Sequence, residues 1–406
     1  METQQQPTTP TPWSNELEKA VDALEALSDE LNDRFPERAE FINCMLNALV
    51  SKQHVLSVGP PGVGKSAITN LLAMAIIKDD GASFKTWSYQ FNKFVTPDEV
   101  FGPMSIKAFE MDVVKRNPKN MLPEADLAVF EEVFKSNSAT LNSVLGALNE
   151  RVWFQEGQSC KIPLRSALMN SNELPSKNEG LAAVVDRIPQ KIWVDKVRMK
   201  ESFESILFTS PEKRNEPLTN TITVKQLDLI YEWAKTLKFV VLAQHALWDI
   251  RETVNDQDIY ISDRRIQAGF ELCKVQALRR CVVFRESDLK VMMADLQPLA
   301  NVFWNELAEK ENVSRIVEKF SQPWKQDLDD ANELLTEAFE HLRCIKLKTA
   351  KTEESVQVIQ KVNMVEVNVK RIEESYPEAK TELLKIERFC KTIKSECEKV
   401  VMPWLS

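Results

Sequence analysis

The feature that most constrains this chain is a cluster of glycines in a sequence that otherwise has few. Glycine occurs nine times in 406 residues, yet Gly59, Gly62 and Gly64 fall within a stretch of six. A short β-prone run, Val55–Val58, precedes the cluster, and the helix-prone stretch "AITNLLAMAII" follows it. Glycines between a strand and a helix let backbone N–H groups turn toward an anion, and the helix N-terminus adds a partial positive charge. The chain is therefore predicted to contain an α/β unit with a phosphate site.

The stretch "HVLSVGPPGVGKS" (54–66) fits the pattern G-x-x-x-x-G-K-S, which adds a lysine and a hydroxyl to the glycines. Lys65 is expected to reach the β- and γ-phosphates of a nucleotide, and the Ser66 hydroxyl to bind Mg²⁺. A turn of this composition can arise by chance, but the flanking strand and helix favour nucleotide binding. The predicted nucleotide-binding residues are Gly59, Pro60, Pro61, Gly62, Val63, Gly64, Lys65 and Ser66.

Two adjacent glutamates, Glu131 and Glu132, end an apolar run in "AVFEEVFK" (128–135). Taken alone, such a pair more often lies on a helix surface as two solvated charges. A nucleoside triphosphatase, however, needs a second strand ending in carboxylates, one for the Mg²⁺ shell and one for the attacking water. Glu131 is therefore predicted as the Mg²⁺-shell residue and Glu132 as the water-activating residue. Aspartate is usual at the first position, and whether the longer Glu131 weakens hydrolysis stays open.

Composition narrows the possible partners and compartments. The net charge of −9 argues against an extended nucleic-acid surface, which usually needs a basic domain. The seven cysteines lack CxxC spacing and the three histidines are dispersed, which favours reduced cytosolic thiols over a disulfide framework or a zinc site. No apolar stretch approaches membrane-spanning length, and the N-terminus lacks a signal-peptide pattern. We expect a cytoplasmic protein without a membrane span, with residues 1–15 as a disordered tail.

Alternating strand and helix patterns predict a parallel five-stranded α/β core over residues 16–197. Residues 198–305 carry apolar side chains at spacings of three and four, which indicates an all-α lid. The segment "VWFQEGQSCKIP" (152–163) is predicted to form a hairpin that turns at Glu156 and Gly157. The candidate strands of the core are 54–58, 85–89, 127–130, 164–169 and 190–194.

The last segment, 306–406, has a different pattern. Its apolar residues step by three and four over 328–345 and again over 358–400, which is the period-3.5 seam of a coiled coil. The polar residues 346–355 are predicted to form the bend of a helical hairpin. The second seam could extend roughly 60 Å as one rod, which Pro377 is expected to kink or interrupt. The seam either packs within the chain or docks a partner, and the sequence favours neither.

Beyond the phosphate loop, several ordered stretches carry a specific resemblance. They are "GPPGVGKS" (59–66), "TPDEVFGPMSI" (96–106), "LPEADLAVFEEVFKSNSATLNSVLGALNER" (122–151), "KIPLRSALMNSNELP" (161–175), "LAAVVDRIP" (181–189) and "SDRR" (262–265). With these residues the chain resembles the MoxR family of AAA+ ATPases, closest to its RavA-like branch, over roughly residues 20–300. Glu131 is the clear departure, since the family pattern has aspartate there.

The resemblance implies an AAA+ ATPase that binds ATP and Mg²⁺, assembles into a hexameric ring and remodels a protein client in a chaperone-like way. It also implies a partner carrying a von Willebrand factor A domain. The segments 116–126 and 152–163 would face the central pore of the ring, although ordinary surface loops fit the same residues. A nucleotide-gated scaffold that assembles through the coiled arm and hydrolyses poorly is the alternative, and a nucleic-acid motor is disfavoured by the acidic charge.

The same resemblance assigns two residues that contact the nucleotide. Asn172 in "MNSNELP" matches the sensor-1 residue that positions water near the γ-phosphate, with Asn170 as a nearby rival. Arg187 in "VVDRIP" matches an arginine finger donated across a subunit boundary. A surface arginine paired with Asp186 is the alternative for Arg187.

A third residue is assigned on the lid. Arg264 in "SDRR" matches sensor 2, with Arg265 as the rival. Ser262 is expected to cap the helix that follows, and that role is compatible with either arginine.

Overall fold

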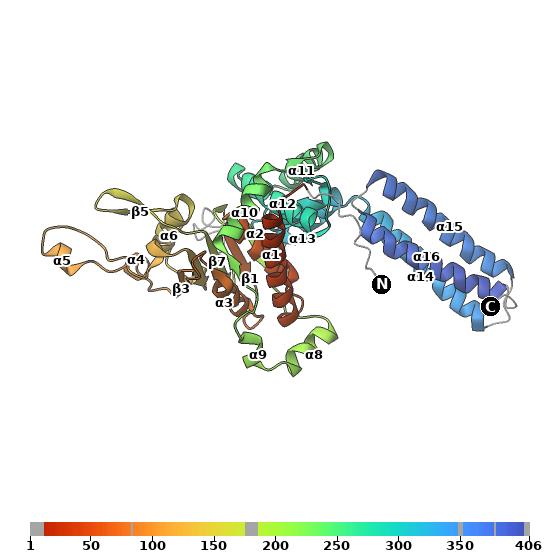
Figure 1. Cartoon of the computed structure of the whole chain (residues 1–406), viewed down its shortest axis with the longest axis horizontal. Helices are drawn as coiled ribbons and strands as arrows, with labels where there is room; N and C mark the ends of the chain where they lie inside the picture. The colour runs from red at the N-terminus through yellow and green to blue at the C-terminus, as the bar shows by residue number, and fades with distance from the viewer. Residues whose placement is uncertain (1–11, 83, 175–185, 348–351, 377–378, 402–406) are drawn as a thin grey trace, which may run out of the picture. The chain divides into compact units, whose positions relative to one another are not determined.

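The computed structural model describes residues 12–82, 84–174, 186–347, 352–376 and 379–401 (Figure 1). They form two compact units. The first comprises the residues up to 317 apart from 292–294, and the second comprises 292–294 and the residues from 318 onward. None of the described helices is both long and apolar enough to cross a membrane.

The first unit is built on a parallel five-stranded sheet with the strand order β3-β4-β7-β1-β8. Its strands are β1 (Val55–Val58), β3 (Thr86–Gln90), β4 (Leu127–Glu131), β7 (Ser166–Ser171) and β8 (Gln190–Trp193). Each lies within two residues of its predicted range, so the prediction of the sheet is confirmed. The central strands are buried almost throughout, as expected of parallel strands whose two faces are covered. Their carboxyl ends meet at one edge, where open α/β sheets place their ligand sites.

The first helix begins just before residue 16, the predicted start of the core. Helix α1 (Asn15–Arg34) is capped by Ser14, whose hydroxyl accepts a hydrogen bond from the N–H of Leu17 at 3.2 Å. Trp13 is buried as well. The predicted disordered tail is therefore too long, because Trp13, Ser14 and Asn15 are ordered, while residues 1–11 lie outside the described part of the chain. The other main helices are α2 (Ala39–Ser51), α3 (Lys65–Ala75) and α6 (Ser138–Glu150).

Two connecting segments, here called excursions, extend from the same side of the sheet. One contains α4 (Pro97–Phe101) and α5 (Ile106–Phe109), and the other is the hairpin of β5 (Val152–Gln155) and β6 (Gln158–Lys161). The hairpin prediction is confirmed. Its two turn residues have φ of 54° and 72°, the positive values that two-residue hairpin turns require. Lys115 Nζ lies 3.1 Å from Glu156 Oε1 and joins the two excursions. That they face a pore stays a prediction.

The residues after β8 form the predicted helical segment. Its elements are α8 (Lys200–Phe208), α9 (Pro211–Asn215), α10 (Val224–Thr236), α11 (Val241–Asn255), α12 (Asp263–Val283), the 3₁₀ segment η4 (Met293–Asn301) and α13 (Leu307–Ser321). Two short parallel pairs interrupt it: β9 (Ile222–Thr223) with β2 (Ile76–Ile77), and β10 (Lys238–Phe239) with β11 (Lys290–Val291). Helices α10 and α12 pack on each other and on α1 and α2.

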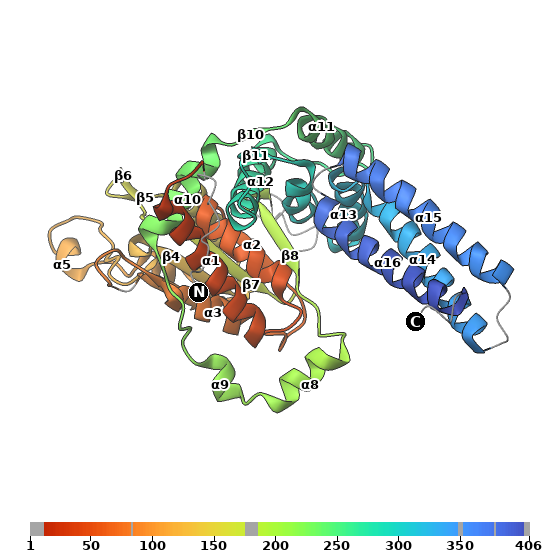
Figure 2. The same ribbon diagram turned by 45° about the vertical axis from the view of Figure 1, so that its right-hand side comes forward.

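The second unit is a bundle of α14 (Lys325–Leu347), α15 (Thr352–Ser375) and α16 (Lys380–Val401), each in contact with both others (Figure 2). The expected interruption near Pro377 matches the end of α15 and the start of α16, but the second arm folds back there, so the unit contains three packed helices where a hairpin was predicted. Helix α15 ends at Ser375, just before the predicted breaker Pro377, since proline disfavours continuation of a helix. Helix α16 then packs back on α14 and α15. Pro377 itself lies outside the described residues. The seam residues, for example Leu335, Val365 and Ile393, are fully buried, so the seam packs within the chain.

Candidate functional site

The loop from Gly59 to Ser66 connects β1 to α3 at the carboxyl edge of the sheet. A Cβ atom at Gly59 would lie 2.0 Å from the carbonyl oxygen of Val194, so only glycine fits where the loop passes β8. Gly64 has φ of 93° and caps α3 without a side-chain acceptor. The first N–H groups of α3 therefore stay available to an anion, and the helix dipole favours negative charge at that point.

Lys65 lies inside this loop and is held by its backbone. Its Nζ donates to the carbonyl oxygens of Gly59 at 2.6 Å and Pro60 at 2.9 Å, and to Asn172 Oδ1 at 3.2 Å. Burial lowers the pKa of Lys65, while the nearby charges of Glu132 and Glu131 act in the opposite direction. Neutral carbonyl oxygens stabilise the ammonium charge only in part, so an anion such as a phosphate would form stronger hydrogen bonds with Lys65 than they do.

The two glutamates lie at the end of β4 and have different surroundings. Glu131 Oε2 accepts a hydrogen bond from Ser66 Oγ at 2.8 Å, and its Oε1 accepts one from Asn170 Nδ2 at 2.9 Å. The predicted Mg²⁺ ligands Ser66 and Glu131 are thus in direct contact, as two oxygens that share a hard cation should be. The glutamate side chain is long enough for its two oxygens to contact α3 and β7 at the same time.

Glu132 departs from the strand with φ of 53° and ψ of 42°, a left-handed conformation that is uncommon for a residue other than glycine. Asn172 Nδ2 donates a hydrogen bond to Glu132 Oε1. The other oxygen, Oε2, is buried without a hydrogen bond, although Lys135 Nζ lies 3.4 Å away. A buried carboxylate oxygen with free acceptor capacity is suited to take a proton from a water in the cavity.

The structure distinguishes the two asparagines. Asn170 is buried in β7, where its Oδ1 accepts from Ser57 Oγ at 2.5 Å and its Nδ2 holds Glu131. Asn172 contacts both Lys65 and Glu132 instead. Asn172 therefore has the surroundings expected of a residue near the γ-phosphate, while Asn170 holds the carboxylate of Glu131.

These groups line one cavity of about 340 Å³, named here the P-loop cavity. Its lining consists of Pro61, Gly62, Val63, Gly64, Lys65, Ser66, Ala67, Glu131, Glu132, Asn170, Ser171 and Asn172. Apart from Gly59 and Pro60, which hold Lys65, every predicted phosphate-loop residue lines it, together with both glutamates. Among the described residues no group of three or more histidines, cysteines and carboxylates that could hold a metal ion occurs.

A second cavity of about 290 Å³ adjoins the first on the other side of the loop, and the sequence did not predict it. It shares Gly62, Val63, Gly64 and Ala67 with the P-loop cavity, and adds Arg34, Phe35, Pro36, Arg38, Lys196, Val197, Ile206, Arg214 and Asn215. Arg38 Nε donates to the carbonyl oxygen of Val63 at 3.1 Å. In the sequence, only Pro36 indicated a turn after α1. That this turn lies next to the phosphate loop could not be predicted, because the two segments meet only in the folded chain.

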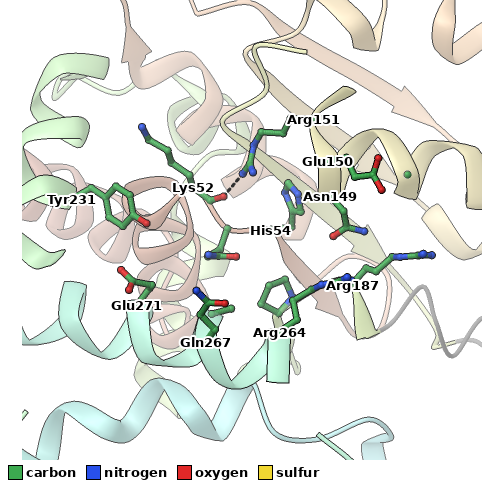
Figure 3. A pocket seen from close by; sticks show the side chains of 14 residues that line it. Lys52, His54, Asn149, Glu150, Arg151, Arg187, Tyr231, Arg264, Gln267 and Glu271 are labelled. Atoms are coloured by element: carbon green, nitrogen blue, oxygen red, sulfur yellow. Dashed lines mark hydrogen bonds between the residues drawn. The ribbon is translucent and has the colours of Figure 1, made fainter. Parts of the chain in front are cut away.

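The two predicted arginines lie elsewhere. Arg187 and Arg264 both line a pocket of about 430 Å³, named here the arginine pocket (Figure 3), and neither lines the P-loop cavity. Lys52 and His54, which precede β1, also line it. Because the phosphate loop follows β1, a strand of four residues, roughly 13 Å, separates the two sites.

The rival Arg265 has a structural role. It is fully buried and donates to the carbonyl oxygens of Val302 and Trp304. Burial lowers its pKa to about 10. Arg264 is exposed, and Ser262 caps α12 by accepting a hydrogen bond from the N–H of Arg265 at 3.4 Å. Of the two arginines, only Arg264 is free to meet a ligand.

The comparisons with known proteins support the same assignment. A family profile described as "MoxR domain in the MoxR-vWA-beta-propeller ternary systems" matches residues 22–232, more than half of the chain. The chain belongs to the MoxR family of AAA+ ATPases. A profile described as an AAA lid domain matches residues 243–317, which extends beyond the predicted lid boundary at 305.

Relatives of this MoxR-family chain include two uncharacterized proteins of Methanocaldococcus jannaschii. MJ0079 is 30% identical over 333 residues, which are 82% of this chain and 83% of the relative. MJ0812 is 29% identical over 363 residues, 88% of this chain and 92% of the relative. The crystal structure of a candidate ATPase from Cytophaga hutchinsonii matches with a TM-score of 0.56 at 16% identity, covering 75% of this chain and 95% of that one, and it shows the likeness of the fold.

Proposed function

We propose that this MoxR-family protein hydrolyses ATP in the P-loop cavity and uses the energy to remodel or activate a protein client. The observation that carries the proposal is the convergence of Lys65, the Ser66–Glu131 pair and the Glu132–Asn172 pair on one cavity. The second cavity beside the loop, lined by Phe35 and Val197, has apolar and cationic walls suited to the base and ribose of the nucleotide.

Each residue has a distinct part in the proposed reaction. Lys65 moves from the loop carbonyls to the β- and γ-phosphates and offsets their charge. Ser66 and Glu131 would hold Mg²⁺, which supplies charge neutralisation on the phosphate oxygens when bound. Glu132, aligned by Asn172, accepts a proton from the attacking water at Oε2, which accepts no hydrogen bond within the chain.

The position of the arginine pocket bears on assembly. Arg187 and Arg264 are separated from their own P-loop cavity by the length of β1, so we propose that both reach the cavity of a neighbouring subunit. An arginine offered in trans stabilises the charge that spreads over the transferred phosphoryl group. A closed head-to-tail ring gives every cavity such a neighbour, and the proposed ring is a hexamer.

The proposed partner is a protein with a von Willebrand factor A domain, because the matched family profile names MoxR–vWA–β-propeller systems. That description does not mention the RavA-like branch, so this finer placement remains a prediction. The expected cytoplasmic location rests on the scattered cysteines, of which Cys44, Cys160, Cys273, Cys281, Cys390 and Cys397 form no disulfide.

A poorly hydrolysing scaffold was the alternative because Glu131 departs from the usual aspartate. The two hydrogen bonds of Glu131 favour the hydrolase instead, since the cavity is built around the longer side chain.

Mixing two inactive variants tests the composite site. Glu132→Gln removes the proton acceptor and Arg187→Ala removes the arginine, so each variant alone should lose turnover by roughly 10³-fold or more. In mixed rings, an intact cavity of an Arg187→Ala chain faces the intact arginine of a Glu132→Gln chain, and phosphate release should partly return. If Arg187→Ala alone keeps wild-type turnover, or if confirmed mixed assemblies stay inactive, the trans assignment is wrong.

A further inference from the structure

The turn between α1 and α2 contacts the phosphate loop at two points. A Cβ atom at Gly64 would lie 3.6 Å from Cδ1 of Phe35, so the phenyl ring packs against the loop. Arg38 Nε donates to the carbonyl oxygen of Val63 at 3.1 Å. Phe35 and Arg38 are each only 6% exposed, and both line the second cavity. The turn is therefore a wall that the phosphate loop and the second cavity share.

The backbone of Glu37 sets the direction of this turn. Its φ is 58°, a left-handed conformation that is uncommon for a residue other than glycine and persists only where the surroundings enforce it. The Glu37 carboxylate accepts hydrogen bonds from the N–H groups of Arg198 and Met199, both at 2.9 Å. Its carbonyl oxygen accepts one from Arg38 Nη1 at 2.8 Å. The Arg38 side chain is thereby fixed between the phosphate loop and the second cavity.

One nitrogen of the Arg38 guanidinium group is left over. Nε and Nη1 donate to carbonyl oxygens, whereas the described part of the chain offers no hydrogen-bond acceptor to Nη2. Burial lowers the pKa of Arg38, and the charges of Glu37 and Asp195 act in the opposite direction. Both carboxylates are engaged elsewhere, Glu37 by backbone N–H groups and Asp195 by Arg198 Nη2 at 2.8 Å. The Nη2 group at the cavity wall is therefore available to an acceptor on a ligand.

The rest of the second cavity is suited to the nucleoside half of a nucleotide. Phe35, Val197 and Ile206 provide apolar walls, on which a base can stack. Arg34, a further cation of this lining, is already paired with Glu30. The edges of a base carry hydrogen-bond acceptors, and so do the ribose hydroxyls. A donor without a partner at this wall therefore gains suitable acceptors once a nucleoside is bound.

We propose that Arg38 is a nucleoside-binding residue, whose Nη2 donates a hydrogen bond to an acceptor on the base or ribose of the bound nucleotide. The inference rests on the proposed function, in which the phosphates occupy the P-loop cavity and the nucleoside occupies the second cavity. Gly62, Val63, Gly64 and Ala67 line both cavities, so one nucleotide can span the loop. Because Arg38 also holds the carbonyl oxygen of Val63, one side chain connects nucleoside recognition to the phosphate loop.

The first test separates the nucleoside from the phosphates. Calorimetry measures the affinity of the full chain for a slowly hydrolysed ATP analogue and for inorganic tripolyphosphate, both with Mg²⁺. Arg38→Met should weaken binding of the analogue at least tenfold, about 1.4 kcal/mol, and leave binding of tripolyphosphate within threefold. Arg198→Met is the matched control and should bind both as wild type does, because it removes an equal charge from a side chain that is 76% exposed and lines neither cavity. Equal losses for both ligands in Arg38→Met, no loss for either, or an equal effect of Arg198→Met overturns the inference.

The second test does not depend on how a variant folds. Wild type should bind the analogue at least tenfold more tightly than tripolyphosphate, and equal affinities overturn the inference. In steady-state phosphate release, Arg38→Met should raise KM for ATP at least tenfold and keep kcat within threefold, because Arg38 does not line the P-loop cavity. A lower kcat at unchanged KM also overturns it. Wild type that shows the difference in binding yet releases no phosphate refutes the proposed function instead, so the two failures are distinguishable.

Discussion

Shortening Glu131 by one methylene is the most informative perturbation of this site. The glutamate bridges Ser66 Oγ at 2.8 Å and Asn170 Nδ2 at 2.9 Å. Aspartate withdraws the carboxylate by roughly 1.5 Å, the length of one C–C bond, so at least one contact lengthens beyond hydrogen-bonding range. A hydrogen bond to a charged group contributes about 1.5–3 kcal/mol. Glu131→Asp should therefore lower turnover by roughly ten- to a hundredfold, since about 1.4 kcal/mol corresponds to a factor of ten.

The assay is steady-state phosphate release as a function of Mg²⁺ concentration. If Glu131 belongs to the Mg²⁺ shell, the half-saturating Mg²⁺ concentration should rise along with the loss of turnover, while nucleotide affinity without Mg²⁺ stays near that of wild type. Glu124→Asp is the matched control, because the Glu124 side chain is partly exposed, lies just before β4 and does not line the P-loop cavity. Turnover and Mg²⁺ dependence equal to wild type in Glu131→Asp would refute the reasoning, and the contacts of the longer side chain would then be incidental.

Three further predictions address binding, pH dependence and the second unit. Lys65→Ala should weaken ATP binding at least a hundredfold, because it removes the cation expected on the β- and γ-phosphates; near-native affinity by calorimetry would contradict the phosphate-loop assignment. His54 accepts from the N–H of Ala167 at 3.0 Å, and burial, with Arg151 nearby, lowers its pKa to about 4. Unfolding titrations should show stability that is complete above pH 6.5, lost progressively toward pH 4 and amounting to at most about 3 kcal/mol, and a His54→Gln chain should lack this component. Ending the chain after Ser321 should leave ATP affinity unchanged, because the residues of the P-loop cavity all lie in the first unit; a large loss of affinity would show that the bundle completes the site.

Local sequence patterns predicted the elements of the core because short-range physics is enough to form them. The apolar runs at β1, β4 and β7 match strands that are buried on both faces. The phosphate loop could be predicted because its backbone requires glycine. Gly59 lies too close to the carbonyl oxygen of Val194 for a side chain, and Gly62 and Gly64 have positive φ. Glu131 and Glu132 could be predicted because a nucleoside triphosphatase needs a second strand that ends in carboxylates.

The bundle in the second unit shows where such patterns are insufficient. The seam was visible as a period of 3.5 residues, but the same seam is compatible with a rod, a hairpin or three helices. Proline at 377 only makes an interruption favourable, and whether α16 then folds back depends on the surface that α14 and α15 offer it.

The sequence by itself determined the phosphate loop of this protein with the strand and helix on either side of it, because the three are contiguous and local geometry requires their residue types. Only the tertiary structure decided how distant residues are grouped. It placed Asn172 between Lys65 and Glu132, gave Glu131 two partners, brought Arg38 to the phosphate loop, and put Arg187 with Arg264 at the far end of β1. These groupings depend on the order of strands in the sheet and on the packing of α12 against α1 and α2, which are contacts between residues far apart in the chain.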